Sequence, residues 1–402
     1  MIHKHASKPT RETVTLDSAT SKKWTGILGT IGLFGLIASG IGLGTDRAQF
    51  FHSYLTSYMF CLSLTLGCLF LTVLQHLVGA HWSIVVRRIA EVVMSNVGLM
   101  VILFVPVALG LHDLYHWTHH DAVAHDRLLQ QKEPYLNTTF FFIRIAVYFL
   151  VWFGVSRFFF QRSVQVDETQ DVGLIQSMRR FSAPSILLFA LTQTFASFDL
   201  LMSLDPHWFS TIFGVYFFAG SVVSAFSLIA LIALLLRSSG KLVNEITPEH
   251  YHDLGKLMFA FTVFWTYIAF SQYFLIWYGN IPEETIFYLN RWEGGWRTVS
   301  LFLAIGHFIV PFVILMSRHA KRKLALLGFM ACWIVFMQYV DMYWLVLPNL
   351  HKQSVGFHWL DVATWMGVTG IWGAVIVRRL GQQALIPAQD PLLIRSLEFE
   401  NV

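Results

Sequence analysis

The chain has 402 residues, of which 55% are hydrophobic and only 13% are charged, and this composition excludes an ordinary soluble globular protein. The net charge of +4 follows from an uneven placement of Lys and Arg around apolar segments, so it does not indicate nucleic-acid binding. The three cysteines, Cys61, Cys68 and Cys332, form no CxxC or CxxCH motif, which excludes structural disulfides, covalently attached haem and an iron–sulfur site.

Apolar windows of about 20 residues predict ten membrane spans. In chain order the spans cover roughly residues 24–44, 54–79, 90–111, 139–160, 181–203, 209–236, 256–278, 299–316, 324–345 and 359–377. The loops are short, so we predict an all-α integral membrane protein with one polytopic domain over residues 24–379. Residues 1–23 form a polar N-terminal segment without a signal peptide, and residues 380–402 form a C-terminal tail.

The positive charges predict the orientation of these spans. Of the 28 Lys and Arg residues, 21 lie in segments on the N-terminal side of the membrane and six on the opposite side, with Arg144 inside a span. Because segments rich in Lys and Arg remain in the cytoplasm, both termini are predicted to be cytoplasmic.

Two spans end on the same pattern, a carboxylate followed seven residues later by a proline: Asp199 with Pro206, and Asp341 with Pro348. This repetition predicts two four-helix bundles. The first contains spans two to five, at about residues 52–203, and the second contains spans six to nine, at about residues 209–346. The first and last spans flank the two bundles.

Carboxylates inside a bilayer are costly and rare unless they function, so Asp199 and Asp341 are the first candidates for a proton path. At ~1.5 Å per residue both lie ~25 Å from the cytoplasmic edge. The preceding spans contain Arg144 and His307, which predicts one pair of Asp199 with Arg144 and another of Asp341 with His307. The alternative is that buried ion pairs only fix the helix packing.

Further polar residues are candidates for the cytoplasmic part of the proton path. His76 and Glu91 lie near the inner ends of their spans and are predicted to form the cytoplasmic limb of the path. His76 and His307 differ in depth by several turns, so they do not predict a bound haem.

A second set of polar residues, Gln193, Gln338, Asp205 and His207, is a candidate quinone or polar site. The histidine-rich loop from His112 to His125 lacks a cysteine or a tight carboxylate set, and we predict no metal site there.

The stretch Ser197-Phe-Asp-Leu-Leu-Met-Ser-Leu-Asp-Pro-His-Trp-Phe-Ser-Thr211, with Gly214-Val-Tyr216 and Phe218-Ala-Gly220 after it, resembles the second NrfD-like membrane subunit, ActF, of bacterial alternative complex III. The run from Tyr135-Leu-Asn137 to Arg144 and the ten-span plan fit the same family. The resemblance covers most of the chain.

The resemblance implies a multi-pass subunit of a quinol:cytochrome c oxidoreductase in the bacterial inner membrane. Its expected partners are a sister NrfD-like subunit (ActC-like), iron–sulfur and cytochrome c subunits, and a terminal oxidase. Haem c and iron–sulfur clusters belong to those partners, and this chain is expected to hold no cofactor of its own. The family name implies quinone binding, and a role in proton conduction or support is the alternative. The sister subunit is the stronger candidate for the quinol site.

We therefore expect the chain to contribute a transmembrane proton path and, as a further hypothesis, a quinone pocket. One alternative is a secondary transporter, which predicts helices broken at the midplane in both repeats. Another is a cofactor-free structural scaffold for redox subunits.

Overall fold

The computed structural model describes residues 14–352 and 354–400, and within them the chain is helical without β-strands. Residues 1–13 of the predicted N-terminal segment lie outside the described part. Ten helices or helix runs are long and apolar enough to cross a membrane. They are α1 (Ser18–Thr45), α2 (Arg47–Val78), α3 to α5 (Ile84–Met94, Val97–Leu103, Val105–Leu109), α9 (Thr138–Thr169), α10 (Val172–Leu200), α11 (Phe213–Ser238), α12 (Pro248–Gly279), α14 with η3 and α15 (Trp296–Leu303, Ala304–Ile309, Val310–Met316), α17 (Leu324–Val346) and α18 (Trp359–Leu380).

Short helices connect these spans. They are α6 (Leu111–Leu114), η1 (His116–Thr118), α7 (His120–His125), α8 (Arg127–Lys132), η2 (Met202–Leu204), α13 (Pro282–Asn290), α16 (Arg318–Arg322), η4 (Leu347–Asn349) and α19 (Leu393–Leu397). Each predicted span is therefore confirmed as a helix or a run of helices. Several of them extend beyond the predicted apolar window, because polar residues at their ends continue the helix.

Capping residues set several helix ends. Asp46 accepts a hydrogen bond from the backbone of Gln49 at the start of α2, and Gly79 ends that helix in the left-handed conformation, with φ of 61°. Thr247 forms a capping box with His250, and Pro248 occupies the first turn of α12.

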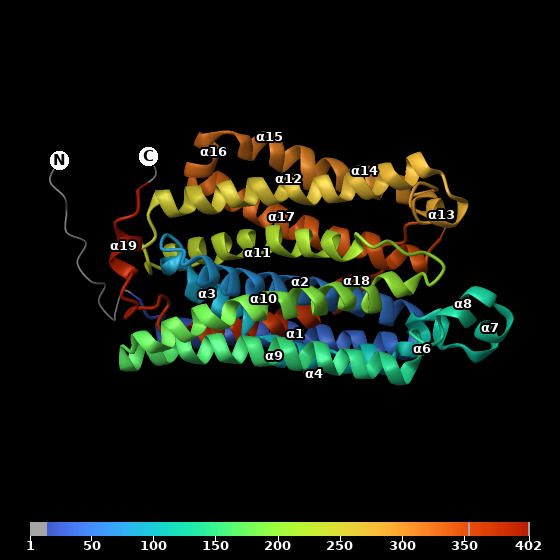
Figure 1. The fold of residues 1–402 in the computed structure, drawn as a ribbon, viewed down its shortest axis with the longest axis horizontal. Coiled ribbons are helices and arrows are strands. Elements are labelled where there is room, and N and C mark those ends of the chain that lie inside the picture. The colour runs from blue at the N-terminus through green and yellow to red at the C-terminus, as the bar shows by residue number, and fades with distance from the viewer. Residues whose placement is uncertain (1–13, 353, 401–402) are drawn as a thin grey trace.

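The spans run side by side along the longest axis of the molecule, and the N- and C-terminal parts of the chain lie at the same end (Figure 1). We call this end the terminus end and the opposite one the distal end. Helices α2 and α11 pack against each other at the centre and are buried over most of their length, whereas α1 and α12 are largely exposed at the periphery. The short helices α6, α7 and α8 project beyond the bundle at the distal end (Figure 1).

Glycines bring the first and last spans into backbone contact. A Cβ added to Gly35 would lie 2.3 Å from the backbone nitrogen of Gly367, and one added to Gly32 would lie 2.5 Å from that of Ile371. These two glycines therefore let the backbones of α1 and α18 approach each other closely. The close approach does not extend to Gly26, which has nothing within 4 Å of an added Cβ.

The eighth span is irregular around His307. Residues Ala304–Ile309 form a π-helical segment between α14 and α15. Pro311 has no N–H to donate to the carbonyl of His307, so the regular hydrogen-bond ladder cannot continue there. The π turn widens the helix and changes the direction of the side chains beyond it.

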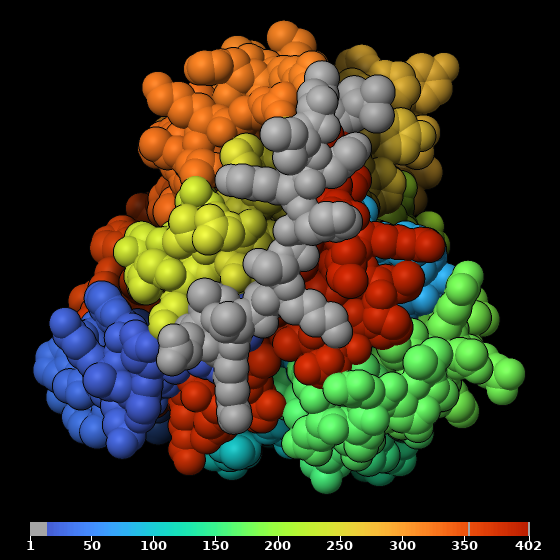
Figure 2. Space-filling model, turned by 90° about the vertical axis from the view of Figure 1, so that its left-hand side faces the viewer, coloured from blue at the N-terminus to red at the C-terminus, as the bar shows by residue number. Residues whose placement is uncertain are grey.

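The C-terminal segment folds back over the terminus end of the bundle. In Figure 2, which faces this end, residues after α18 lie between the α9–α10 connection and the start of α12. The hydroxyl of Ser396 donates to the carbonyl of Trp82, and a ring nitrogen of His250 lies 2.9 Å from the carbonyl oxygen of Ser396. The predicted C-terminal tail is thus packed against the helices.

Candidate functional site

The first predicted pair is present. Arg144 on α9 binds Asp199 on α10 through two parallel hydrogen bonds, from Nε to Oδ2 and from Nη2 to Oδ1, each 2.9 Å long. Asp199 has no exposed surface. Tyr148 donates a further hydrogen bond of 2.7 Å to Oδ2 of Asp199, and Arg144 also donates to the carbonyl of Tyr135 at 2.7 Å. The negative charge of Asp199 is therefore fully compensated by a bidentate cation and a hydroxyl.

Asp341, the second repeated carboxylate, has a different environment. It is 1% exposed on α17, and Tyr216 on α11 donates its hydroxyl hydrogen to Oδ1 of Asp341. No Lys, Arg or His nitrogen lies within 4.0 Å of Asp341 in residues 14–352 and 354–400. A buried carboxyl group without a cation changes its charge at lower cost than one held by a guanidinium.

The predicted pair of Asp341 with His307 is wrong. The ring of His307 is completely buried and stacks on Trp265, with ring centroids 4.0 Å apart and planes inclined by 25°. Neither ring nitrogen of His307 has a hydrogen-bond partner among the described residues. His307 lies in the π turn and packs on Trp265 of α12, and Tyr216 occupies the position beside the carboxylate.

The structure brings His76 and Glu91 together, in a group that we call the terminus-end cluster. Its ionisable members are His76, Arg87, Arg88, Glu91, Asp167 and Asp390.

Glu91 is the centre of the cluster and has no exposed surface. Its carboxylate oxygens lie 3.3 Å from Nε of Arg87, 3.4 Å from Nε of Arg88 and 3.9 Å from Nε2 of His76. Ser163 donates a hydrogen bond of 2.7 Å to the same carboxylate. The arrangement joins α2, α3 and α9 through one buried anion.

Two further carboxylates complete the cluster. Asp390 accepts from Arg87 and Asp167 accepts from Arg88, each at 2.5 Å. With His76 neutral, three carboxylates face two guanidinium groups, so protonation of His76 would balance the charge.

The sequence contains a signal for part of this cluster, because Arg87 and Arg88 precede Glu91 by four and three residues on one helix.

The second predicted set, the candidate quinone or polar site, does not converge. The side chain of Gln193 donates to the carbonyl of Gly214, and that of Gln338 donates to Ser63, both at 3.2 Å within helix–helix contacts. Asp205 and His207 lie in the turn between α10 and α11 at the distal end.

That turn is tied to the projecting helices. A ring nitrogen of His207 lies 2.6 Å from Oδ2 of Asp126, and Nζ of Lys132 donates to the carbonyl of Pro206 at 2.5 Å. The hydrogen bond from His207, followed by the one from the N–H of Leu129, lowers the pKa of Asp126 below its ordinary value. The turn therefore anchors α8 to the bundle.

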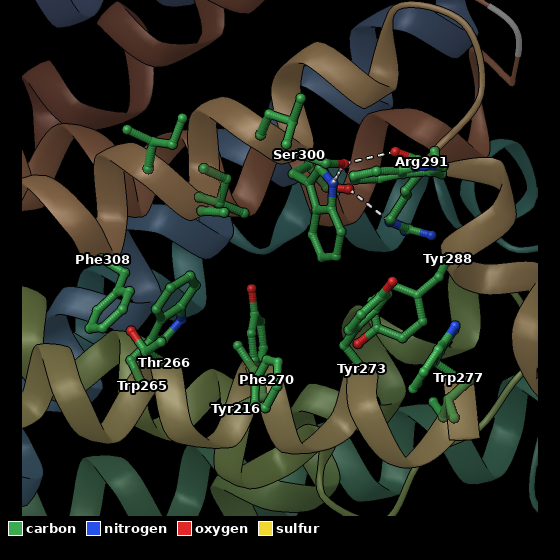
Figure 3. Close-up of a pocket in the computed structure, with 18 of the residues that line it drawn as sticks. Tyr216, Trp265, Thr266, Phe270, Tyr273, Trp277, Tyr288, Arg291, Ser300 and Phe308 are labelled. Carbon is green, nitrogen blue, oxygen red and sulfur yellow. Dashed lines mark hydrogen bonds between the residues drawn. The ribbon is translucent and has the colours of Figure 1, made fainter. Parts of the chain in front are cut away.

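A cavity of about 970 Å³ lies between α12 and the irregular eighth span, and α13 closes its distal end (Figure 3). Aromatic and aliphatic side chains form most of its surface, and Tyr216 reaches into it between Trp265 and Tyr273 in this view (Figure 3). Tyr267 and Phe270 are 64% and 59% exposed, so the cavity opens on the side of the bundle. None of the four residues predicted for a quinone site lines it.

Arg291 lies at the distal end of this cavity and is 3% exposed. Its guanidinium donates to the carbonyls of Phe287, Trp344 and Leu345, at 3.0 to 3.1 Å, and lies 3.5 Å from the ring centroid of Phe287. Burial lowers the pKa of this guanidinium, and the charge of Asp205 opposes that effect. Arg291 therefore fixes the last turns of α13 and α17, whose carbonyls attract a cation.

Sequence reasoning missed a third buried aspartate. Asp361 in the first turn of α18 is 2% exposed and accepts from Ser53 at 2.5 Å and from Gln49 at 3.1 Å. Its other oxygen accepts from the backbone N–H of His358. The sequence did contain a signal for Asp361. It is a single carboxylate in the third position of an apolar helix, and the same criterion, a lone carboxylate in an apolar helix, had selected Asp199 and Asp341.

The histidine-rich loop forms α6, η1 and α7. The rings of His112 and His119 stack with centroids 3.8 Å apart, and Nδ1 of His112 lies 3.2 Å from the hydroxyl of Thr118. Among the residues that the structure describes, no group of three or more His, Cys, Asp or Glu side chains is arranged to hold a metal ion.

The fold and these buried polar groups are those of a multi-pass membrane protein with ten candidate spans. No protein-family model matches the chain, and no curated protein matches its sequence.

Proposed function

We propose that the chain is a proton-conducting membrane subunit of a bacterial quinol:electron-acceptor oxidoreductase of the alternative complex III type. The segment of closest resemblance, residues 197–220, contains Asp199 and also Tyr216, the hydrogen-bond partner of Asp341. Haem and iron–sulfur groups would lie in partner subunits. We place the protein in the inner membrane with both termini in the cytoplasm, because 21 of the 28 Lys and Arg residues belong to sequence segments predicted to lie on the N-terminal side of the membrane.

The observation that supports this proposal best is the double contact of Tyr216. Its hydroxyl donates to the buried carboxyl of Asp341, and its ring lines the large cavity between α12 and α14. A hydroxyl in this position can pass a proton between a molecule in the cavity and the carboxyl group. The cavity is apolar, opens on the side of the bundle and has the size of typical ligand pockets, which suits the ring and first tail segments of a quinone.

In this proposal the proton path has two limbs. Asp341, Tyr216 and His307 form the distal limb, and His76 with Glu91 forms the limb at the terminus end. Asp199 occupies the position in the first bundle that corresponds to Asp341 in the second. Its bidentate ion pair with Arg144 favours a structural role for Asp199.

We interpret the eight central spans as two four-helix bundles with α1 and α18 flanking them. The first bundle contains α2, α3 to α5, α9 and α10, and the second contains α11, α12, the eighth span and α17. The packing of α10 on α9 and α2 in the first group, and of α11 on α12 and α17 in the second, supports this division, and the contact of α2 with α11 joins the two groups. A transporter is less well supported, since among the described residues the interrupted spans do not correspond. The eighth span has a π segment while its counterpart α9 is continuous, and α3 to α5 are separate helices while their counterpart α12 is continuous.

The test uses the purified complex, reconstituted into vesicles with a quinol substrate. We expect Tyr216→Phe and Asp341→Asn to lower proton release per electron, and His76→Leu to slow proton uptake only on the side of the terminus end. Ala304→Trp should obstruct the cavity and lower the apparent affinity for quinol, because Ala304 lines the cavity whereas Asp341 and Asp199 do not.

Leu150→Trp is the matched control, because Leu150 is 71% exposed on α9 and lies outside the cavity lining. Full turnover, unchanged membrane potential and unchanged quinol affinity in all these variants would contradict the proposal and favour a structural scaffold.

A further inference from the structure

A second, smaller cavity of about 260 Å³ lies toward the terminus end, between α9, the end of α3 and the end of α18. Its lining contains two arginines, Arg157 and Arg379, together with three glutamines and two serines. Phe153 and Phe160 form its apolar wall. No carboxylate lines this cavity.

The two guanidinium groups have no carboxylate partner. Within residues 14–352 and 354–400, no Asp or Glu oxygen lies within 4.0 Å of a nitrogen of Arg157 or Arg379. Arg379 is partly buried and donates from Nη1 to the hydroxyl of Ser95. Two cations that share a small cavity repel each other unless an anion lies between them.

The serines supply no free hydroxyl hydrogen to this cavity. Ser95 donates to the carbonyl of Val92 at 2.6 Å, and Ser156 donates to that of Met94 at 3.0 Å. The remaining donors are the guanidinium N–H groups and the amides of the glutamines. This combination of two positive charges and neutral N–H donors suits a phosphate group, which guanidinium groups bind through paired hydrogen bonds.

The position of the cavity indicates the source of the phosphate. Arg379 stands one residue before the end of α18 at Leu380, where a membrane helix meets the head-group layer. From the cavity, an exposed apolar face of α9 runs toward the distal end through Phe153, Leu150 and Val147, which are 44%, 71% and 48% exposed. Such a face offers contact to an acyl chain.

We propose that this cavity binds the phosphate group of an anionic phospholipid, with an acyl chain lying along α9. Arg157 and Arg379 bind the phosphate oxygens, the glutamine amides contact the remainder of the head group, and Phe153 and Phe160 pack on the first methylene groups. This site is independent of the proposed redox function, since no residue of it belongs to the proton path.

The test is a thermal-unfolding series on the full chain in detergent, with added phosphatidylglycerol, phosphatidylcholine or inorganic phosphate. We expect phosphatidylglycerol to raise the midpoint more than phosphatidylcholine does, and inorganic phosphate to leave it unchanged. The double variant Arg157→Gln/Arg379→Gln should bind phosphatidylglycerol at least about ten-fold more weakly, since each charge-assisted hydrogen bond is lost.

Arg378→Gln is the matched control, because Arg378 neighbours Arg379 on α18 but does not line the cavity. Arg378→Gln should show the same rise of the unfolding midpoint with phosphatidylglycerol as the unmodified chain. Native mass spectrometry should show one retained anionic lipid in the unmodified chain and in Arg378→Gln. An equal response to phosphatidylglycerol in the double variant would overturn the site. A response to inorganic phosphate as large as that to the lipid would assign the cavity to a free anion instead.

Discussion

Arg144 holds Asp199 through two hydrogen bonds of equal length, 2.9 Å, in the interior of the helix bundle. The equivalent Asp341 has a tyrosine hydroxyl in place of a cation. One repeated carboxylate thus has a bidentate cationic partner while the other has only a hydroxyl, so the two positions should respond differently to the same substitution.

Asp199→Asn should destabilise the protein by about 3–5 kcal/mol, because it leaves the guanidinium of Arg144 buried without its anion. Thermal unfolding of the purified chain measures this loss. Asp113→Asn is the control, since it removes a 2.9 Å pair with Arg47 whose arginine is 61% exposed, and such surface pairs contribute at most about 1 kcal/mol. Equal unfolding midpoints for Asp199→Asn and the unmodified chain would contradict a structural role for the Asp199 pair.

His307→Phe should change stability by less than about 1.5 kcal/mol, because a phenyl ring of similar volume can keep the stack on Trp265 and no hydrogen bond of the ring is lost. If His307 conducts protons, the variant should lose proton translocation while its stability changes by no more than this amount. Translocation at the unmodified rate would remove His307 from the proton path.

Asp390→Asn should destabilise the terminus end by on the order of 3 kcal/mol, because Arg87 then keeps only the more distant contact to Glu91. Hydrogen exchange of the residues around α19 should increase in the same variant. Glu398→Gln, on the exposed part of the same segment, serves as the control and should leave both quantities unchanged. Unaltered exchange in Asp390→Asn would show that the segment is held by its other contacts.

Gly35→Ala should separate α1 from α18 and cost about 1–3 kcal/mol, because the new methyl group would meet the backbone of Gly367 at 2.3 Å. Gly26→Ala is the matched control on the same helix, with open space around an added Cβ. Cross-linking between cysteines placed on the two helices reports their separation. The same cross-linking yield in both variants would disprove the close contact.

Acid should release α8 from the bundle. The pKa of Asp126 is lowered in the folded protein, so its contribution to stability is present above the ordinary aspartate value of about 3.9 and is lost as the pH falls through the lower folded value. A spin label at Gln131→Cys should gain mobility only below about pH 3.9. Asp126→Asn should make the label mobile at every pH, and a label that stays immobile in acid would exclude this tether.

The ten spans follow from the sequence because the thickness of the hydrocarbon layer fixes the length of each apolar run. The pair of Arg144 with Asp199 was predictable from depth alone, since both helices are regular on the facing side. The same reasoning failed for His307, because depth does not specify the direction of a side chain and the π turn before Pro311 changes that direction.

Other parts of the site depend on contacts that no local pattern contains. The large cavity lies where α12, which packs closely on α15, has little contact with α14, and this depends on packing of the whole bundle. Likewise, nothing near Asp390 in the sequence indicates that it meets Arg87, which lies 303 residues earlier.

That separation has a consequence for the order of biosynthesis. At about 5–20 residues per second, the ribosome adds Asp390 roughly 15–60 s after Arg87. Throughout this interval Arg87 lacks its shortest ionic contact, although α3 has already been made. The terminus end can therefore reach its final arrangement only when translation is nearly complete, and chains that stall before residue 390 should differ from full-length ones at this end alone.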